Sequence, residues 1–185
     1  MATLHFHTEF DSPVGPITFQ GDGTHLTGLH FPSHRHWPGV PESSQRSDDL
    51  FHEARRQLSE YFQGTRQSFD LPLRATGTPF QQRVWDELLR IPFGETRSYA
   101  ELARRVGNPA ATRAVGAANG RNPISIIIPC HRVIATSGVL TGYGGGLERK
   151  RQLLALEQHL PPARSPGQRV LFEVTAGRSA PVAGG

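Results

Sequence analysis

Residues 98–123 read SYAELARRVGNPAATRAVGAANGRNP, and this stretch predicts two short helices joined by a tight turn. Ser98 followed three positions later by Glu101 is a capping box, the usual signal for the start of a helix. The Gly-Asn-Pro turn at 107–109 ends the first helix and begins a second one over 109–118. Two short helices around a glycine-containing turn are typical of a helix-turn-helix unit.

The second helix of this unit consists mostly of alanine and glycine, and Arg113 is its only charged residue. One interpretation is structural, because alanine is a strong helix former and a face of small side chains packs well against a neighbouring helix. The other is functional, because small side chains let a backbone lie close to nucleic acid while one long cation projects into a groove. The pattern favours neither interpretation over the other.

A longer helix is predicted immediately before this unit. Thr78 and Gln81 form a second capping box, and Pro79 occupies the first helical position. Residues 91–94, Ile-Pro-Phe-Gly, end the helix. Its apolar stripe consists of Phe80, Val84, Leu88 and Ile91, with Trp85 and Leu89 beside it.

The first part of the chain predicts a small α+β unit. Apolar and polar residues alternate over 4–10, the pattern of a half-buried strand, and 16–19 and 26–31 predict two further strands. Residues 32–46 lack periodicity and predict an irregular loop, after which Ser47 is expected to cap a helix that ends at Gly64. The apolar face of that helix comprises Leu50, Phe51, Ala54, Leu58, Tyr61 and Phe62.

Downstream of the helix-turn-helix unit, the β-branched run 124–128 predicts a buried strand that presents Cys130 and His131 at its end. A glycine-rich loop at 142–146 precedes a last helix over 147–160, and the Pro- and Gly-rich tail 161–185 is expected to be poorly ordered. The apolar face of the last helix comprises Leu153, Leu154, Leu156 and Leu160.

Composition excludes several classes of protein. The 185 residues are 36% hydrophobic and 19% charged, which is typical of a globular chain. The single cysteine excludes an internal disulfide framework, a cysteine-rich zinc site and a Cys-x-x-Cys redox pair. Without a long apolar run or a signal-peptide pattern, the protein is expected to be soluble and cytoplasmic. The histidines of the N-terminal part alternate on a strand or lie in a loop, and no metal site is expected there.

Charge is distributed unevenly along the chain. Residues 1–78 carry six Arg and nine Asp or Glu, a balance of −3, whereas 79–160 carry eleven Lys or Arg and six acids, a balance of +5. A mildly acidic front half and a basic back half suggest that the back half meets a polyanion.

Cys130 and His131 are the candidates for nucleophilic chemistry. An unperturbed thiol is only about 3% thiolate at pH 7, so a nucleophilic cysteine needs a base or a positive field. His131 can act as that base, directly or through a water, and a carboxylate would orient its imidazole. Spacing alone leaves Glu157, Glu148 and Glu101 in competition for the orienting role.

Several motifs taken in order resemble the O6-alkylguanine-DNA alkyltransferases. The resemblance is dense over 78–160 and looser over 1–77. The motifs are NPISIIIPCHRV at 122–133, Phe80-Gln81 with Val84-Trp85, IPFGE at 91–95, Ser98-Tyr99, Ala114-Val115-Gly116 after Arg113, GYGGG at 142–146 and LLALE at 153–157.

The resemblance implies an α+β fold in two domains and a flexible tail. Residues 1–75 would form a ribonuclease H-like domain of small sheet and helix in a supporting role. Residues 76–160 would form a mainly helical, winged helix-turn-helix-like domain that binds DNA and carries the active site. Residues 161–185 would be the tail.

The same resemblance implies direct, single-turnover repair of O6-alkylguanine, extending to O4-alkylthymine, with the alkyl group ending on Cys130. His131 would be a water-mediated base, Glu157 would orient it, Asn122 would support the active-site turn, and Tyr99 would donate a proton or hydrogen bond to the departing base. Arg113 would replace the flipped nucleotide. The other implied contacts are Ala114, Gly116 and Ala117 to DNA, and Val133, Tyr143 and Gly144 around the base.

The implied partner is double-stranded DNA bound through the minor groove, with no membrane, metal or cofactor. The protein would be a monomer off DNA, cooperative assembly on DNA being left open, and it would reside with the nucleoid in the cytoplasm. Two positions depart from some relatives, which carry serine at Gly144 and proline at Ser125. Two other functions fit part of the pattern: a Cys-His-Glu hydrolase or acyl transferase, and a helix-turn-helix regulator with an inert thiol.

Overall fold

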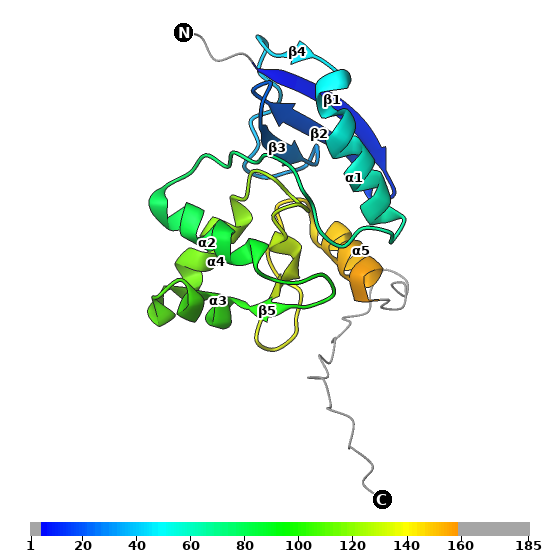
Figure 1. Cartoon of the computed structure of the whole chain (residues 1–185). Helices are drawn as coiled ribbons and strands as arrows, with labels where there is room; N and C mark the ends of the chain where they lie inside the picture. The colour runs from blue at the N-terminus through cyan, green and yellow to red at the C-terminus, as the bar shows by residue number, and fades with distance from the viewer. Residues whose placement is uncertain (1–4, 159–185) are drawn as a thin grey trace, which may run out of the picture.

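The computed structural model describes residues 5–158, so Leu4 and the tail 161–185 lie outside the described residues. The chain forms an α+β structure in two parts (Figure 1). A small sheet with one helix lies at one end, and a group of helices carrying the predicted helix-turn-helix lies at the other. The last helix, α5 (Leu147–Gln158), lies beside the lower end of α1 (His52–Phe62), where the two parts meet.

The N-terminal sheet has the strand order β3-β2-β1-β4. The three predicted strands are present as β1 (Phe6–Ser12), β2 (Gly15–Gly21) and β3 (Leu26–His30), which pair antiparallel in sequence order. The fourth strand, β4 (Gln45–Arg46), pairs parallel with β1. The expectation that 32–46 is wholly irregular is therefore wrong at its end, because a two-residue strand is too short to show periodicity.

The helix predicted after Ser47 begins later than expected. A 3₁₀ turn over Asp49–Phe51 precedes α1, and the Ser47 hydroxyl accepts a long hydrogen bond of 3.5 Å from the Leu50 amide. Leu50, predicted on the apolar face, is 49% exposed, which is a correction to that face. The buried residues of the face are Phe51, Ala54, Leu58 and Tyr61.

Both predicted capping boxes are present in the C-terminal part. Thr78 caps α2 (Pro79–Leu89), with Pro79 in the first turn, and Ser98 caps α3 (Tyr99–Arg105). In each box the side chain of the third helical residue accepts a hydrogen bond from the backbone amide of the cap. These local signals fix the starts of two helices without help from the rest of the fold.

The alanine-rich helix packs one face as the structural interpretation predicts and leaves the opposite face exposed. A 3₁₀ turn over Pro109–Ala111 leads into α4 (Thr112–Gly120), which packs on α2 and α3. Val115 and Ala118 lie on its buried face, and the Trp85 indole donates to the Ala118 carbonyl at 3.0 Å. The opposite face carries Arg113, Ala114 and Ala117, all exposed.

The run 124–128 is not a strand, contrary to the prediction. All five residues are buried, but only Ile124 makes a single bridge, to Leu29 of β3, and Ser125–Ile127 form a turn. Ile126 has a φ of 71°, a left-handed conformation that a β-branched residue rarely adopts. A run of apolar residues records burial, and burial alone does not distinguish a strand from a packed turn.

As a consequence, Cys130 does not stand at the end of a strand. It begins a 3₁₀ helix, Cys130–Arg132, which leads into β6 (Val133–Ile134), and β6 pairs parallel with β5 (Arg97–Ser98). The last helix, α5, buries Leu153 and Leu154 as predicted, but its buried face also includes Lys150 and Glu157, two charged residues. Leu160 lies outside the described residues.

No helix in residues 5–158 is both long enough and apolar enough to cross a membrane.

Two buried histidines lie where the sheet faces the helical part. His30, at the end of β3, stacks on Trp37 with ring centroids 5.1 Å apart, and the His34 ring packs edge-on against it at 5.4 Å. Burial, together with neighbouring His34, lowers the pKa of His30 to about 3. The histidine is therefore held neutral in the folded protein.

This burial predicts acid sensitivity. Because the folded pKa of His30 lies below its unfolded value of about 6.5, the unfolded chain binds more protons as the pH falls from about 6.5 towards 3. The free energy of unfolding should therefore drop, by up to about 1.4 kcal/mol per pH unit from this residue. Urea denaturation at about pH 7 and about pH 5 should show a smaller drop for His30→Gln than for wild type. The exposed control His52→Gln should keep the wild-type drop, and an unchanged drop in His30→Gln would contradict the prediction.

Candidate active site

Asn122 organises the backbone that carries Cys130. Its side-chain amide donates to the carbonyls of Ile128 at 2.7 Å and Ile124 at 3.4 Å, and its carbonyl accepts from the Ile124 amide at 3.0 Å. One fully buried side chain thus replaces the ladder partners that the 124–128 run lacks. The same amide donates to Cys130 Sγ at 3.0 Å, so the turn and the thiol are held by one group.

The Cys130 thiol is 3% exposed. Burial raises its pKa, while the hydrogen bond from Asn122, the positive charge of Lys150 and nearby backbone amides act in the opposite direction. Asn119, on the buried face of α4, donates to the Cys130 carbonyl at 3.3 Å. The cysteine backbone is therefore tied directly to the helix whose outer face carries Arg113.

His131 and Glu157 form a fully buried pair. His131 Nε2 lies 2.8 Å from Glu157 Oε1, and both side chains have no exposed surface. Burial lowers the pKa of His131 in spite of the carboxylate, so the imidazole is neutral. Burial opposes ionisation of Glu157, but hydrogen bonds and charges from His131 and Arg132 hold its pKa well below the usual range. Of the three glutamates that the spacing left open, Glu157 is the one beside His131.

Three further donors around Glu157 are not predicted by the sequence. Arg132 makes a two-pronged contact with the carboxylate, at 2.8 Å and 2.9 Å, and also donates to the Ile91 carbonyl at 2.6 Å. The Tyr61 hydroxyl donates to Oε1 at 2.7 Å, and the Gly94 amide donates to Oε2 at 3.3 Å. Tyr61 comes from α1, so the N-terminal part contributes directly to the candidate site.

Lys150 is a further residue of the site that the sequence did not single out. It is fully buried on α5, and its ammonium donates to the carbonyls of Val133 at 2.6 Å and Thr141 at 2.8 Å. Burial lowers its pKa to about 8, while the proximity of Cys130 opposes that shift. The available signal was its rarity, because Lys150 is the only lysine among the 20 basic residues of the chain.

Tyr99 and the glycine-rich loop lie together. The Tyr99 hydroxyl donates to the carbonyls of Thr141 at 3.2 Å and Gly142 at 3.4 Å. Burial raises the pKa of Tyr99, so its hydroxyl stays protonated and remains a donor. Burial and the nearby Cys130 thiol likewise raise the pKa of Tyr143. The loop 141–146 and Tyr99 therefore both lie close to the cysteine.

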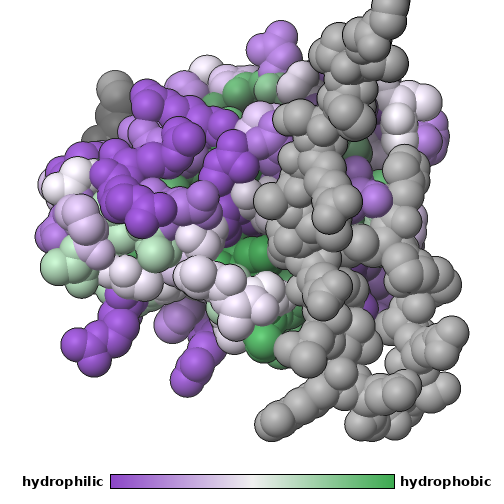
Figure 2. All heavy atoms as spheres, turned by 90° about the horizontal axis from the view of Figure 1, so that it is seen from below, coloured by the Kyte–Doolittle hydropathy of each residue, from purple (hydrophilic) through white to green (hydrophobic). Residues whose placement is uncertain are grey.

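The predicted DNA-contacting residues lie on the outer face of α4. Arg113, Ala114 and Ala117 are exposed, and Gly116 is half-buried, with room for a Cβ 3.7 Å from the Tyr99 ring. That proximity joins the α4 face to the Tyr99 side of the site. Seen from below, the surface has a cluster of strongly hydrophilic side chains next to a stretch of intermediate hydropathy (Figure 2).

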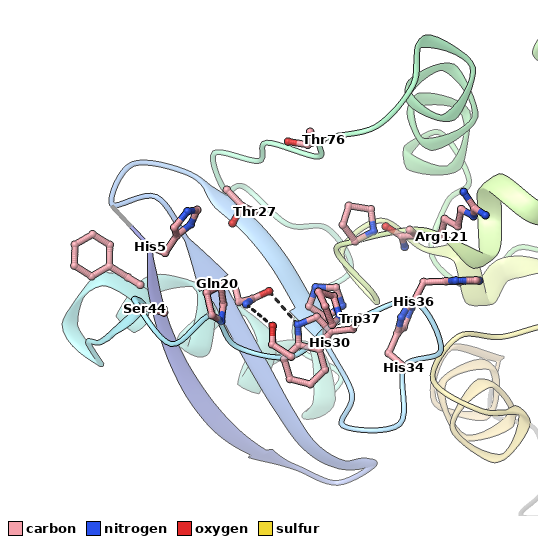
Figure 3. A pocket seen from close by; sticks show the side chains of 16 residues that line it. His5, Gln20, Thr27, His30, His34, His36, Trp37, Ser44, Thr76 and Arg121 are labelled. Atoms are coloured by element: carbon pink, nitrogen blue, oxygen red, sulfur yellow. Dashed lines mark hydrogen bonds between the residues drawn. The ribbon is translucent and has the colours of Figure 1, made fainter. Parts of the chain in front are cut away.

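A separate cavity of about 370 Å³ lies between the two parts of the molecule (Figure 3). Its lining includes His30, His34, Trp37 and Arg121, and Asn122 reaches it, but Cys130 does not line it. Within residues 5–158 no three His, Cys, Asp or Glu side chains are grouped so that they could hold a metal ion. The structure thus brings together Cys130, His131, Glu157, Asn122, Tyr99 and the 141–146 loop, and the histidine-lined cavity adjoins this group at Asn122 without reaching Cys130.

Removing the Tyr61 hydroxyl tests the Glu157 cluster. In Tyr61→Phe a buried carboxylate loses one donor, and hydrogen bonds to charged groups contribute about 1.5–3 kcal/mol. We expect the free energy of unfolding to fall by about that amount, measured by urea denaturation near pH 7. Tyr143→Phe serves as the control, because it removes a buried tyrosine hydroxyl that makes no hydrogen bond to a charged group among the described residues. Equal losses in the two variants would contradict a specific role for the Tyr61–Glu157 bond.

Comparison with known proteins gives the family. Residues 79–159 match the DNA-binding domain of 6-O-methylguanine DNA methyltransferase, and residues 6–75 match its ribonuclease-like domain. Methylated-DNA--protein-cysteine methyltransferases from Mycobacterium tuberculosis and Methanosarcina acetivorans are 51% and 50% identical, over 92% and 82% of this chain and 99% and 97% of theirs. A crystal structure of Mycobacterium tuberculosis OGT in complex with DNA superimposes with a TM-score of 0.79 at 51% identity, covering 85% of this chain and 96% of that one. The chain belongs to the 6-O-methylguanine DNA methyltransferase family.

Proposed function

We propose that this protein repairs DNA by moving an alkyl group from the O6 atom of guanine to Cys130, once per molecule. The observation that carries the proposal is a buried cysteine held by Asn122, beside a His131–Glu157 pair, on the unit that exposes the α4 face. Family membership and that face favour DNA repair over a hydrolase, or over a regulator with an inert thiol. The DNA-binding and transfer domain would span 76–160, with 1–75 in support.

His131 is suited to take the thiol proton. The ionised Glu157 accepts from Nε2–H, which leaves the lone pair on Nδ1 free to act as base. Within the described residues His131 Nδ1 is buried and has no hydrogen-bond partner. Cys130 Sγ accepts a hydrogen bond from Asn122 and makes none with the His131 ring. The proton would therefore pass from sulfur to Nδ1 through one bridging water.

The buried charges favour the thiolate. Arg132 and Lys150 contribute two positive charges and Glu157 one negative charge, which leaves an excess of one positive charge around a neutral imidazole. Forming the thiolate at Cys130 balances that excess, and this offsets part of the penalty that burial imposes on a charged sulfur. Burial, and to a lesser extent the same two cations, lowers the pKa of His131 in the resting site, so the base is available at neutral pH.

Transfer is a displacement at a saturated carbon. The thiolate electron pair forms the S–C bond while the C–O6 bond breaks, and its electrons stay on the departing guanine. The Tyr99 hydroxyl, protonated and placed at the loop beside the thiol, would donate to that developing anion. The product on Cys130 is a thioether, which lacks the carbonyl that water attacks in a thioester, so the acceptor is not regenerated. O4-alkylthymine carries the same type of alkyl–oxygen bond and is a second substrate by the same chemistry.

The α4 face would bring the lesion to the cysteine. A base whose reacting atom lies inside the duplex must leave the stack, at a cost of a few kcal/mol. We infer that Arg113 fills the vacated space from the minor groove, while Ala114, Gly116 and Ala117 let the backbone approach the DNA closely. The flipped base would lie against the backbone of Val133 and against Tyr143 and Gly144. We place the protein in the cytoplasm with the nucleoid, where this DNA substrate lies.

Intact mass spectrometry tests the transfer itself. After incubation with a duplex containing O6-methylguanine, the wild-type chain should gain one CH₂ unit, located on the peptide containing Cys130. Cys130→Ser should gain no alkyl mass, because the serine hydroxyl stays protonated at neutral pH and is a poor nucleophile. The variant should still bind the duplex. Repeated turnover with an unmodified protein, or normal transfer in the variant, would overturn the proposal.

Arg113→Ala tests the role of the α4 face in flipping. Transfer from duplex O6-methylguanine should slow by an amount corresponding to a few kcal/mol, because nothing replaces the extruded nucleotide. Transfer from free O6-benzylguanine, which needs no flipping, should keep its wild-type rate. The matched control is Arg46→Ala, which removes an exposed arginine from the N-terminal sheet and should alter neither rate. Equal slowing on both substrates would show that Arg113 does not act in flipping.

A further inference from the structure

Two loops from different parts of the chain meet beside the candidate base pocket. Residues 31–37 follow β3 in the N-terminal part, and 142–146 form the glycine-rich loop before α5. The Arg35 amide donates to the Gly144 carbonyl at 3.4 Å, and the Phe31 and Tyr143 rings pack edge-on with centroids 6.4 Å apart. Arg149 links the two loops, because its guanidinium donates to Ser33 Oγ at 3.1 Å and to the Gly145 carbonyl at 2.9 Å.

Gly144 and Gly145 have no room for a side chain. A Cβ on Gly144 would lie 2.7 Å from His34 Cδ2 and closer still to Nε2, and a Cβ on Gly145 would lie 2.5 Å from Phe31 Cδ2. Neither glycine is among those with positive φ, whereas Gly142 and Gly146 at the ends of the loop are. The two central glycines are thus required by side chains of the N-terminal part, and not by backbone conformation.

His34 is buried against Gly144. Its ring is 6% exposed and packs at 5.4 Å against His30, which in turn stacks on Trp37 (Figure 3). Phe31, which packs against Gly145, is fully buried. The guanidinium carbon of Arg149 lies 4.8 Å from the centroid of its ring. A side chain at position 144 would therefore have to displace either the His34 ring or the loop.

The other side of the same loop faces the reacting groups. Thr141 and Gly142 accept from the Tyr99 hydroxyl, and Thr141 also accepts from Lys150. A shift of Gly144 is transmitted along three residues to these carbonyls, since the loop lies between the N-terminal side chains and Tyr99. The position of the pocket wall therefore depends on residues that are far from Cys130 in the sequence.

We propose that His34 is a positioning residue that fixes the Gly144 backbone, and with it the width of the pocket for the alkylated base. The proposal rests on the proposed alkyl transfer and extends it to the size of the alkyl group. A side chain at 144 pushes the loop away from His34 and towards Tyr99, so the pocket narrows. Transfer of a bulky alkyl group is then slowed more than transfer of a methyl group. Removing the His34 ring makes room for the new side chain and restores the wall.

A double-mutant cycle on Gly144→Ala and His34→Ala tests this coupling. The rate of alkylation of Cys130 is followed by intact mass with free O6-benzylguanine and with an O6-methylguanine duplex. Gly144→Ala should slow the benzyl reaction by on the order of tenfold or more, and the methyl reaction less. Adding His34→Ala to Gly144→Ala should recover most of that loss. His36→Ala, an exposed histidine of the same loop, should neither slow the reaction nor rescue Gly144→Ala.

Three outcomes would overturn the proposal. The first is additive effects in the cycle, and the second is equal slowing of the benzyl and methyl reactions. The third is an unaltered rate in Gly144→Ala, which would mean that the His34 ring moves into the adjacent cavity without shifting the loop. Binding to an unmodified duplex and the urea midpoint are measured for each variant, and rescue in the double variant separates repositioning from a failure to fold. A wild-type chain that gains no alkyl mass at all would instead refute the proposed function, independently of the cycle.

Discussion

The buried carboxylate of Glu157 is the group on which the rest of the structure depends. Its two oxygens accept five hydrogen bonds, from Tyr61, His131, Gly94 and twice from Arg132. These donors come from α1, from the turn after α2 and from the segment that follows Cys130. A charge at this depth is tolerated only when every lone pair is engaged, so the elements that supply the donors must assemble together. The site is therefore complete only when these elements are packed together.

This arrangement explains how the site combines rigidity with reactivity. Arg132 neutralises Glu157, so the carboxylate orients His131 without making the imidazole strongly basic. Lys150 remains without a carboxylate partner among the described residues, and its charge is directed at the thiol and at two backbone carbonyls. The histidine serves as an acceptor of protons, and the positive charge that favours the thiolate comes from Lys150.

Local signals in the sequence predicted the local structure correctly. The capping boxes at Thr78 and Ser98 act within one helical turn. Alternation identified the first strand, and short runs bounded by turn residues identified the next two. The run 124–128 was predicted wrongly because it bonds partly within its own turn and partly to the Asn122 side chain, and no pattern of apolar residues records such partners. The family motifs indicated Cys130, His131 and Glu157. Tyr61 was missed because it lies 96 residues from its partner Glu157.

The solitary lysine has a consequence for the charged surface. Since Lys150 is fully buried, every cationic side chain that the chain can offer to phosphates, histidine aside, is an arginine. A guanidinium stays charged at any pH a cell experiences and is not a substrate for lysine acetylation. The attraction of this protein to the DNA backbone therefore depends on the salt concentration. It does not change when an amine side chain titrates or is acetylated.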